Sequence, residues 1–154
     1  MTTNKPTSAF VLASWGVLIT GMLGYMIGLW NASMLLNEKG YYFTVLMFGL
    51  FGAISVQKSV RDRLEKIPVT DIYYGLSWVA TIMAVLLLVI GLYNATGMSL
   101  SEKGFYGMAF TLAMFAAITV QKNTRDLVAA GGDDSEPTVN LSRGFSWGKE
   151  QAES

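Results

Sequence analysis

The sequence predicts an all-α, polytopic membrane protein in which four transmembrane helices form two tandem, parallel repeats of a helical hairpin. Three observations predict this architecture. Only 14% of the 154 residues are charged, whereas soluble domains average about 25%. The apolar residues are concentrated in four stretches without any charge, and the two halves of the chain repeat the same motifs.

Each charge-free stretch is long enough to cross a bilayer. The stretches cover residues 6–37, 40–57, 72–101 and 104–121. A transmembrane helix needs about 20 mainly apolar residues, with a range of roughly 17–25. We therefore expect four helices, near Phe10–Asn31, Tyr41–Gln57, Tyr73–Asn94 and Phe105–Gln121.

A soluble four-helix bundle is the main alternative to a membrane protein. Its helices would carry a polar face that recurs about every 3.6 residues. Residues 83–91 read Met-Ala-Val-Leu-Leu-Leu-Val-Ile-Gly and have no such face, and 154 residues are too few to shield four helices of this kind from water. The first stretch also exceeds the roughly 7–15 apolar residues of a signal peptide, so we expect it to be retained.

The Lys and Arg residues predict how the chain is oriented in the membrane. Nine of the eleven lie in the N-terminal segment, in the loop between the second and third helices or in the C-terminal segment. The two other loops hold only Lys39 and Lys103, each next to a Glu. The positive-inside rule therefore places both termini and the middle loop in the cytoplasm. The aromatic residues expected to anchor the helices at the membrane surfaces are Trp15, Trp30, Trp78 and Tyr93.

Four motifs occur twice along the chain, 63 or 64 residues apart. They are Ser-Trp, Gly-Leu-aromatic-Asn-Ala, Glu-Lys-Gly-aromatic-Tyr and Val-Gln-Lys-x-x-Arg-Asp, and they begin at residues 14, 28, 38 and 56 in the first copy. Each copy contains an even number of helices, so both copies have the same topology. A pseudo-two-fold axis along the membrane normal would relate them.

These repeated motifs resemble those of the YiaA/YiaB family of small bacterial inner-membrane proteins. The resemblance covers about residues 9–126, which include both copies, and leaves out the C-terminal segment. It implies a duplicated two-helix domain in the bacterial inner membrane, as in the longer, four-helix members, and brings no catalytic residue, ligand or mechanism. The expected organisation is a cytoplasmic segment 1–9, repeat one 10–62, a cytoplasmic linker 63–72, repeat two 73–126 and a cytoplasmic, disordered tail 127–154.

The Gln-Lys-x-x-Arg-Asp boxes at the inner ends of the second and fourth helices are the candidate contact sites. Their cations would lie near the negative end of the helix dipole and near the anionic inner leaflet. Three interpretations stay open: anchoring, including ion pairs between the two boxes across the pseudo-axis; a lipid or partner site; and catalysis on a headgroup. The candidate lipid or partner contacts are Gln57, Lys58, Arg61, Asp62, Gln121, Lys122, Arg125 and Asp126.

Small residues along the helices mark candidate packing faces, because they let backbones approach closely where lipid provides no hydrophobic drive. The candidate packing residues are Gly24, Gly28, Gly49, Ala53, Ala113 and Ala117. In the outer loops we expect Gly40 and Gly104 to form the tight reversal or the helix entry.

Residue types that are missing narrow the function. The chain has no Cys and no His, and no charged residue lies in the middle of an apolar stretch. Proton-coupled carriers and ion pumps usually need such a charge. We therefore expect no catalytic residue, no cofactor, no metal and no enzymatic activity. Eleven cations balance eleven acids, so nucleic acid is not an expected partner either.

The sequence is most consistent with a non-catalytic scaffold, modulator or envelope-maintenance factor that acts through helix packing and the two boxes. Its partners would be the lipid bilayer and a second copy or another membrane protein. The alternative is a small oligomeric transporter or pore for a neutral solute. In the tail we expect disorder over residues 131–140. The two aromatic and two cationic residues within 143–149 leave two interpretations open: a plain solvated tail, which we favour, and a segment that touches the inner face of the membrane.

Overall fold

The computed structural model describes residues 5–133, which form four long helices joined by short connections. The helices are α1 (Ser8–Asn31), α2 (Leu36–Leu64), α3 (Asp71–Asn94) and α4 (Leu100–Asp133). All four are long and apolar enough to cross a membrane. The predicted fold class, an all-α protein with a duplicated pair of membrane-spanning helices, is therefore confirmed.

Equivalent residues begin the helices in the two repeats. The hydroxyls of Thr7 and Thr70 accept hydrogen bonds from backbone N–H groups in the first turns of α1 and α3. The carboxylates of Glu38 and Glu102 accept the N–H groups that precede α2 and α4, at 2.9 and 2.7 Å. Such contacts satisfy donors that a helix start leaves unpaired. The two copies therefore also share the residues that cap their helices.

The second and fourth helices are longer than their apolar stretches, and this corrects one expectation. Gly40 and Gly104 lie a full turn inside α2 and α4, and neither has a positive φ. The prediction that they form the reversal or the helix entry is wrong, because the Glu caps begin each helix before the glycine. Residues 127–133 of the expected disordered tail likewise belong to α4, so the expectation of disorder is wrong for them. Residues 134–154, which include the segment 143–149, lie outside the described residues.

At its other end α2 stops in a turn with a left-handed residue. Lys66 has φ of 60°, and the N–H of Ile67 donates to the carbonyl of Asp62 at 2.8 Å. This pair of features forms a Schellman motif, which closes the last helical turn. The chain then passes through Pro68 to the Thr70 cap of α3.

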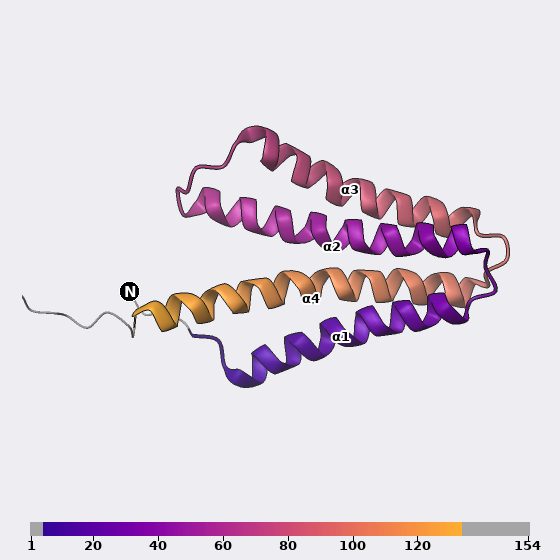
Figure 1. The fold of residues 1–154 in the computed structure, drawn as a ribbon, viewed down its shortest axis with the longest axis horizontal. Coiled ribbons are helices and arrows are strands. Elements are labelled where there is room, and N and C mark those ends of the chain that lie inside the picture. Colours follow the sequence, from indigo (N-terminus) through magenta and orange to yellow (C-terminus); the bar gives the residue numbers. More distant parts are fainter. Residues whose placement is uncertain (1–4, 134–154) are drawn as a thin grey trace, which may run out of the picture.

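The helices lie side by side in the order α3, α2, α4, α1 (Figure 1). α1 packs along α4 and α3 packs along α2, whereas α1 with α2 and α3 with α4 make far fewer contacts. The helices of one repeat therefore pair mainly with those of the other. The two helices that are consecutive within a repeat do not pack closely on each other. We call the end with the α1–α2 and α3–α4 connections the hairpin end, and the opposite end the box end.

This order leaves the outer helices open. Only 17% of the most apolar 18-residue window is buried in α1 and in α3, compared with 44% in α2 and 39% in α4. α2 and α4 thus form the centre of the protein, while α1 and α3 each present most of their apolar surface outward.

Aromatic rings hold the two central helices together at the hairpin end. Tyr42 and Tyr106 occupy equivalent positions and stack with their ring centroids 6.0 Å apart. Tyr25 of α1 meets Tyr106 edge-on and donates its hydroxyl proton to the carbonyl of Tyr42 at 3.0 Å. The residue equivalent to Tyr25 in α3 is Leu88, so this hydrogen bond exists on one side of the pseudo-axis alone.

Candidate functional site

Five charged residues meet between α2 and α4 at the box end, and we call them the ion-pair cluster: Arg61, Asp62, Glu65, Arg125 and Asp126. Arg61 Nη1 donates to Asp126 Oδ1 at 3.2 Å, and Arg125 Nη1 donates to Asp62 Oδ1 at 3.0 Å. The two pairs are equivalent under the repeat. Each copy therefore gives one arginine to the aspartate of the other copy.

Glu65 joins both arginines and breaks the symmetry of the cluster. Its Oε1 accepts a hydrogen bond from Arg61 Nε at 2.6 Å, and its Oε2 accepts one from Arg125 Nη2 at 3.2 Å. The equivalent residue in the second repeat is Ala129, which has no acceptor. One carboxylate therefore bridges the two copies, next to the two exchanged pairs.

The cluster can fix the position of α2 relative to α4. Asp62 is buried and both arginine side chains are largely covered, so separation of the helices would leave charges without partners. A hydrogen bond to a charged group contributes about 1.5–3 kcal/mol, more than the roughly 0–1 kcal/mol of an exposed pair. The geometry thus favours the interpretation of the boxes as ion pairs across the pseudo-axis.

The other four box residues do not join the cluster. Lys58 and Lys122 are exposed, and neither forms an ion pair with residues 5–133. Gln57 and Gln121 are half-buried, and their side-chain oxygens are buried without a hydrogen-bond partner in the described part of the chain. The arginine and aspartate of each box are therefore committed to packing, while the lysines remain available for external contacts.

A buried polar contact joins α1 to α4 near the cluster. Asn123 Nδ2 donates to Ser14 Oγ at 3.0 Å, and Ser14 Oγ donates to the carbonyl of Phe10 at 2.7 Å. The equivalent residues on the other side, Ser59 and Ser77, are also buried. We did not predict this contact from the sequence; the only signal for it was the recurrence of the Ser-Trp motif.

The small residues lie where helices of different repeats meet. A Cβ atom added to Gly28 would lie 2.9 Å from a ring carbon of Phe105, and one added to Gly49 would lie 2.5 Å from a ring carbon of Phe110. Gly24 is looser, since its Cβ would lie 3.7 Å from Phe105. The other three candidate packing residues are buried and are Ala53, Ala113 and Ala117.

Three glycines outside that candidate set are equally close to a neighbouring helix. A Cβ on Gly21 would lie 3.0 Å from the backbone nitrogen of Ala113, and one on Gly52 would lie 2.8 Å from the hydroxyl of Thr81. Gly91, the equivalent of Gly28, lies against the ring of Tyr41. The repeat of Gly28 at Gly91 was the sequence signal that could have identified this last contact.

The four predicted surface anchors are exposed side chains on the outer helices: Trp15, Trp30, Trp78 and Tyr93. Trp15 and Trp78 lie toward the box end, and Trp30 and Tyr93 toward the hairpin end. Their position at the membrane surfaces stays a prediction.

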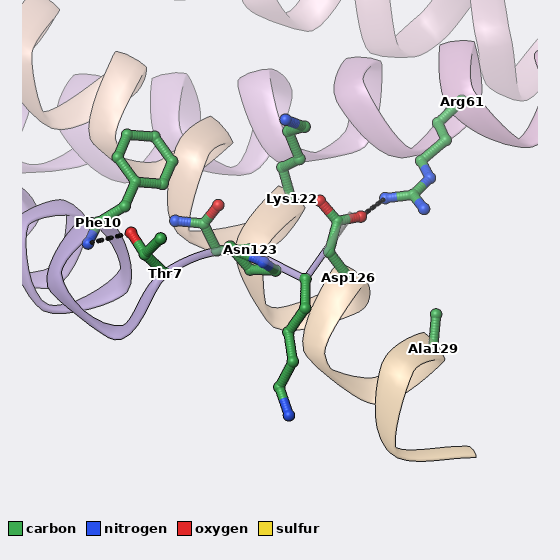
Figure 2. Close-up of a pocket in the computed structure, with 9 residues that line it drawn as sticks. Thr7, Phe10, Arg61, Lys122, Asn123, Asp126 and Ala129 are labelled. Atoms are coloured by element: carbon green, nitrogen blue, oxygen red, sulfur yellow. Dashed lines mark hydrogen bonds and ion pairs between the residues drawn. The ribbon is translucent and has the colours of Figure 1, made fainter. Parts of the chain in front are cut away.

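Two cavities accompany this arrangement. One, of about 610 Å³, opens at the box end between the start of α1 and the later turns of α4 (Figure 2). The other, of about 430 Å³, lies between α3 and α4 and is lined almost entirely by apolar side chains, such as Leu88 and Phe110. Within the described range, no group of three or more acidic residues is placed to hold a metal ion.

These features define a class of integral membrane protein with a duplicated two-helix domain whose copies are joined by ion pairs. A family model described as the yiaA/B two helix domain matches residues 10–62 and 73–126. The chain belongs to this YiaA/YiaB family. The family assignment agrees with the resemblance that the repeated motifs indicate.

Named relatives give the same classification. The chain is 58% identical to the inner membrane protein YiaA of Escherichia coli (strain K12) over 118 residues, which are 77% of this chain and 81% of the relative. It is 31% identical to the inner membrane protein YiaB of the same strain over 99 residues, 64% of this chain and 83% of the relative. The uncharacterized membrane protein YubF of Bacillus subtilis (strain 168) is 43% identical over 63 residues, 40% of this chain and 72% of the relative.

No solved structure matches the chain. The relatives and the four apolar helices support a multi-pass location in the inner membrane. Neither the family description nor the names of the relatives indicate an enzymatic activity.

The ion-pair cluster makes a prediction about stability. Replacement of Asp62 by Asn should lower the free energy of unfolding by about 1–3 kcal/mol, because Arg125 loses a charged acceptor in a buried setting. The matched control is Asp71→Asn, which removes the acceptor of the exposed Arg63 pair and should cost less than about 0.5 kcal/mol. Thermal or denaturant unfolding of the purified protein in detergent measures both. Equal effects of the two substitutions would contradict the structural role of the cluster.

Proposed function

We propose that this protein is a non-catalytic scaffold or modulator of the inner membrane, which acts by association with other membrane proteins or with a second copy of itself. The observation that supports this proposal most directly is the open, single-layer order of the helices (Figure 1). Side chains such as Leu23 and Ile27 of α1, and Val79 and Val89 of α3, point outward from the layer. Membrane helices associate through such faces by close packing.

In this proposal the ion-pair cluster has a structural role, which is to hold α2 against α4, and it is not a reactive site. Its arginines and aspartates hold the two repeats in one arrangement, so the outer faces of α1 and α3 are presented at a constant spacing. Lys58 and Lys122 extend the contact surface at the box end, where they suit acidic residues of a partner protein. In each box, the Arg and Asp residues thus pack the two repeats together, while the Lys residue makes external contacts.

A pore for a neutral solute is the competing function, and the polar side chains in the spans do not favour it. Thr20 and Thr111 donate their hydroxyl protons to carbonyls of their own helices, at 2.8 Å each. The cavity between α3 and α4 is apolar. A solute path would therefore need further copies of the chain to line it.

We also propose that the box end faces the cytoplasm. Among the described residues, it carries Lys5, the cations of both boxes, Arg63 at the end of α2 and Lys66 in the α2–α3 connection. At the hairpin end, Lys39 Nζ donates to the carbonyl of Trp30 in the last turn of α1, and Lys103 follows the Glu102 cap in the sequence. Positive charge on the cytoplasmic side is the rule for short loops of inner-membrane proteins.

This orientation predicts which single cysteines can be labelled from outside the cell. The chain has no Cys, so Asn37→Cys at the hairpin end and Ile67→Cys at the box end each introduce a unique thiol. A maleimide that cannot cross the inner membrane should label Asn37→Cys in intact spheroplasts. It should label Ile67→Cys only after lysis. The opposite pattern would reverse the proposed orientation.

The association proposal is tested with a photo-crosslinking residue in native membranes. At Leu23, which is 54% exposed on α1, it should give one adduct of defined mass, either a dimer of the chain or a single partner. The matched control is Leu46, which is fully buried in the core and should give none. If no adduct forms and the purified protein instead accelerates the efflux of a neutral sugar alcohol from liposomes, the pore replaces the scaffold.

A further inference from the structure

The pocket at the box end is strongly cationic. Its lining includes Lys5, Arg61 and Lys122, together with the single carboxylate of Asp126. That carboxylate already accepts a hydrogen bond from Arg61, and Figure 2 shows Arg61 reaching across from α2 to make it. The lining therefore has an excess of positive charge, and it lies beside the ion-pair cluster.

Comparison of the two repeats explains why a pocket forms on this side. Ala129 lines the pocket, and its equivalent in the first repeat is Glu65, whose carboxylate bridges the two arginines. A methyl group thus stands where the other repeat has a carboxylate. Lys5 is also particular to this side, since its equivalent 63 residues later is Pro68. Both differences, an acid lost and a cation gained, favour a negatively charged ligand.

The hydrogen-bond donors of the cluster point to the same conclusion. Glu65 accepts from Arg61 Nε and from Arg125 Nη2. Under the pseudo-symmetry, the donors that correspond to these beside Ala129 are Arg125 Nε and Arg61 Nη2. Neither nitrogen forms a hydrogen bond to the protein over residues 5–133. A group with two negatively charged oxygens can take from Arg61 Nη2 the hydrogen bond that a carboxylate receives in the other repeat.

The surroundings of the pocket identify the source of the anion. The half-exposed ring of Phe10, in the first turn of α1, lines the pocket next to the charged side chains. Two turns further along α1, on the same helix face as Phe10, Val17 is also exposed. A ligand here meets cations at the end of the span and apolar side chains along the span. A phospholipid has this order of groups, with a phosphate above its acyl chains.

We propose that this pocket binds the phosphate of an anionic phospholipid headgroup through Arg61, Lys122 and Lys5, with the acyl chains lying along α1 past Phe10. Arginine and lysine are the residues that bind phosphate oxygens most strongly, through charge-assisted hydrogen bonds. This site is additional to the proposed scaffold function and does not depend on it. It is also specific to one side of the pseudo-axis.

Lipid binding to the full-length protein in detergent micelles tests the proposal, with phosphatidylglycerol as the anionic probe and phosphatidylcholine as the reference. Native mass spectrometry measures the apparent Kd of each. Lys122→Gln should weaken phosphatidylglycerol binding about tenfold, because it removes one charge-assisted hydrogen bond. The matched control is Lys58→Gln, the equivalent lysine outside the pocket, which should change the Kd less than about twofold.

A second substitution tests the pocket from the opposite direction. Ala129→Glu places the carboxylate of the first repeat where the phosphate is proposed to bind, and it should also weaken phosphatidylglycerol binding about tenfold while the protein stays folded. Equal losses in Lys122→Gln and Lys58→Gln would indicate general surface attraction and would overturn the site. Unchanged binding in both Lys122→Gln and Ala129→Glu would overturn it as well.

Soluble competitors distinguish a lipid from a free phosphate compound. Inorganic phosphate and glycerol phosphate should not displace phosphatidylglycerol at millimolar concentration, because they lack the acyl chains that contact α1. Full displacement at that concentration would retain an anion site but would overturn its assignment to a phospholipid.

Discussion

The exchange of arginine–aspartate pairs between the two repeats is the interaction on which the arrangement of the helices depends. Arg61 and Arg125 each pair with an aspartate of the opposite repeat, Asp126 and Asp62, and would lose these partners if α2 and α4 separated. The pairs therefore place α2 beside α4. At the hairpin end the stacked rings of Tyr42 and Tyr106 perform the same task. Between these two ends, glycine and alanine let the helices approach closely.

With α2 and α4 in the centre, the outer helices can pack only on the flanks. α1 lies on α4 and α3 lies on α2, so each outer helix is held by the repeat to which it does not belong. A duplicated hairpin in sequence thus becomes an interlocked pair of repeats in space. The same arrangement exposes two apolar helix faces at a fixed spacing, and these faces underlie the proposed scaffold function.

Much of this fold could be predicted from the sequence because charge is so unevenly placed. Gaps between charged residues located the four helices, and the recurring motifs revealed the repeat. The pairing of helices could not be predicted in the same way. Lys58 and Asp62 are four residues apart, so the box motif fits a contact within one helix as well as a contact between repeats. The sequence therefore left the ion pairs of Arg61 and Arg125 as one of several open interpretations.

Several features that the sequence did not predict lie where the repeats differ. Glu65, Asn123 and Lys5 have Ala129, Ser59 and Pro68 as their equivalents, so none belongs to a shared motif. Such residues do not recur in the other repeat, so the repeated motifs give no indication of their role. The turn role of Gly40 failed for a different reason, since a glycine between loop and helix is compatible with either and the Glu38 cap decides the boundary.

Disulfide formation between engineered cysteines tests the pairing of helices across repeats most directly. In the cysteine-free chain, Ser14→Cys with Asn123→Cys joins positions whose side chains are hydrogen-bonded between α1 and α4. The control pair, Ser14→Cys with Ser59→Cys, replaces Asn123 by its equivalent in the first repeat, so both cysteines then lie in the same repeat. After oxidation in native membranes and proteolysis, mass spectrometry should find linked peptides for the first pair and none for the second. Linkage of Ser14 to Ser59 instead would mean that each hairpin packs on itself, and would contradict the interlocked arrangement.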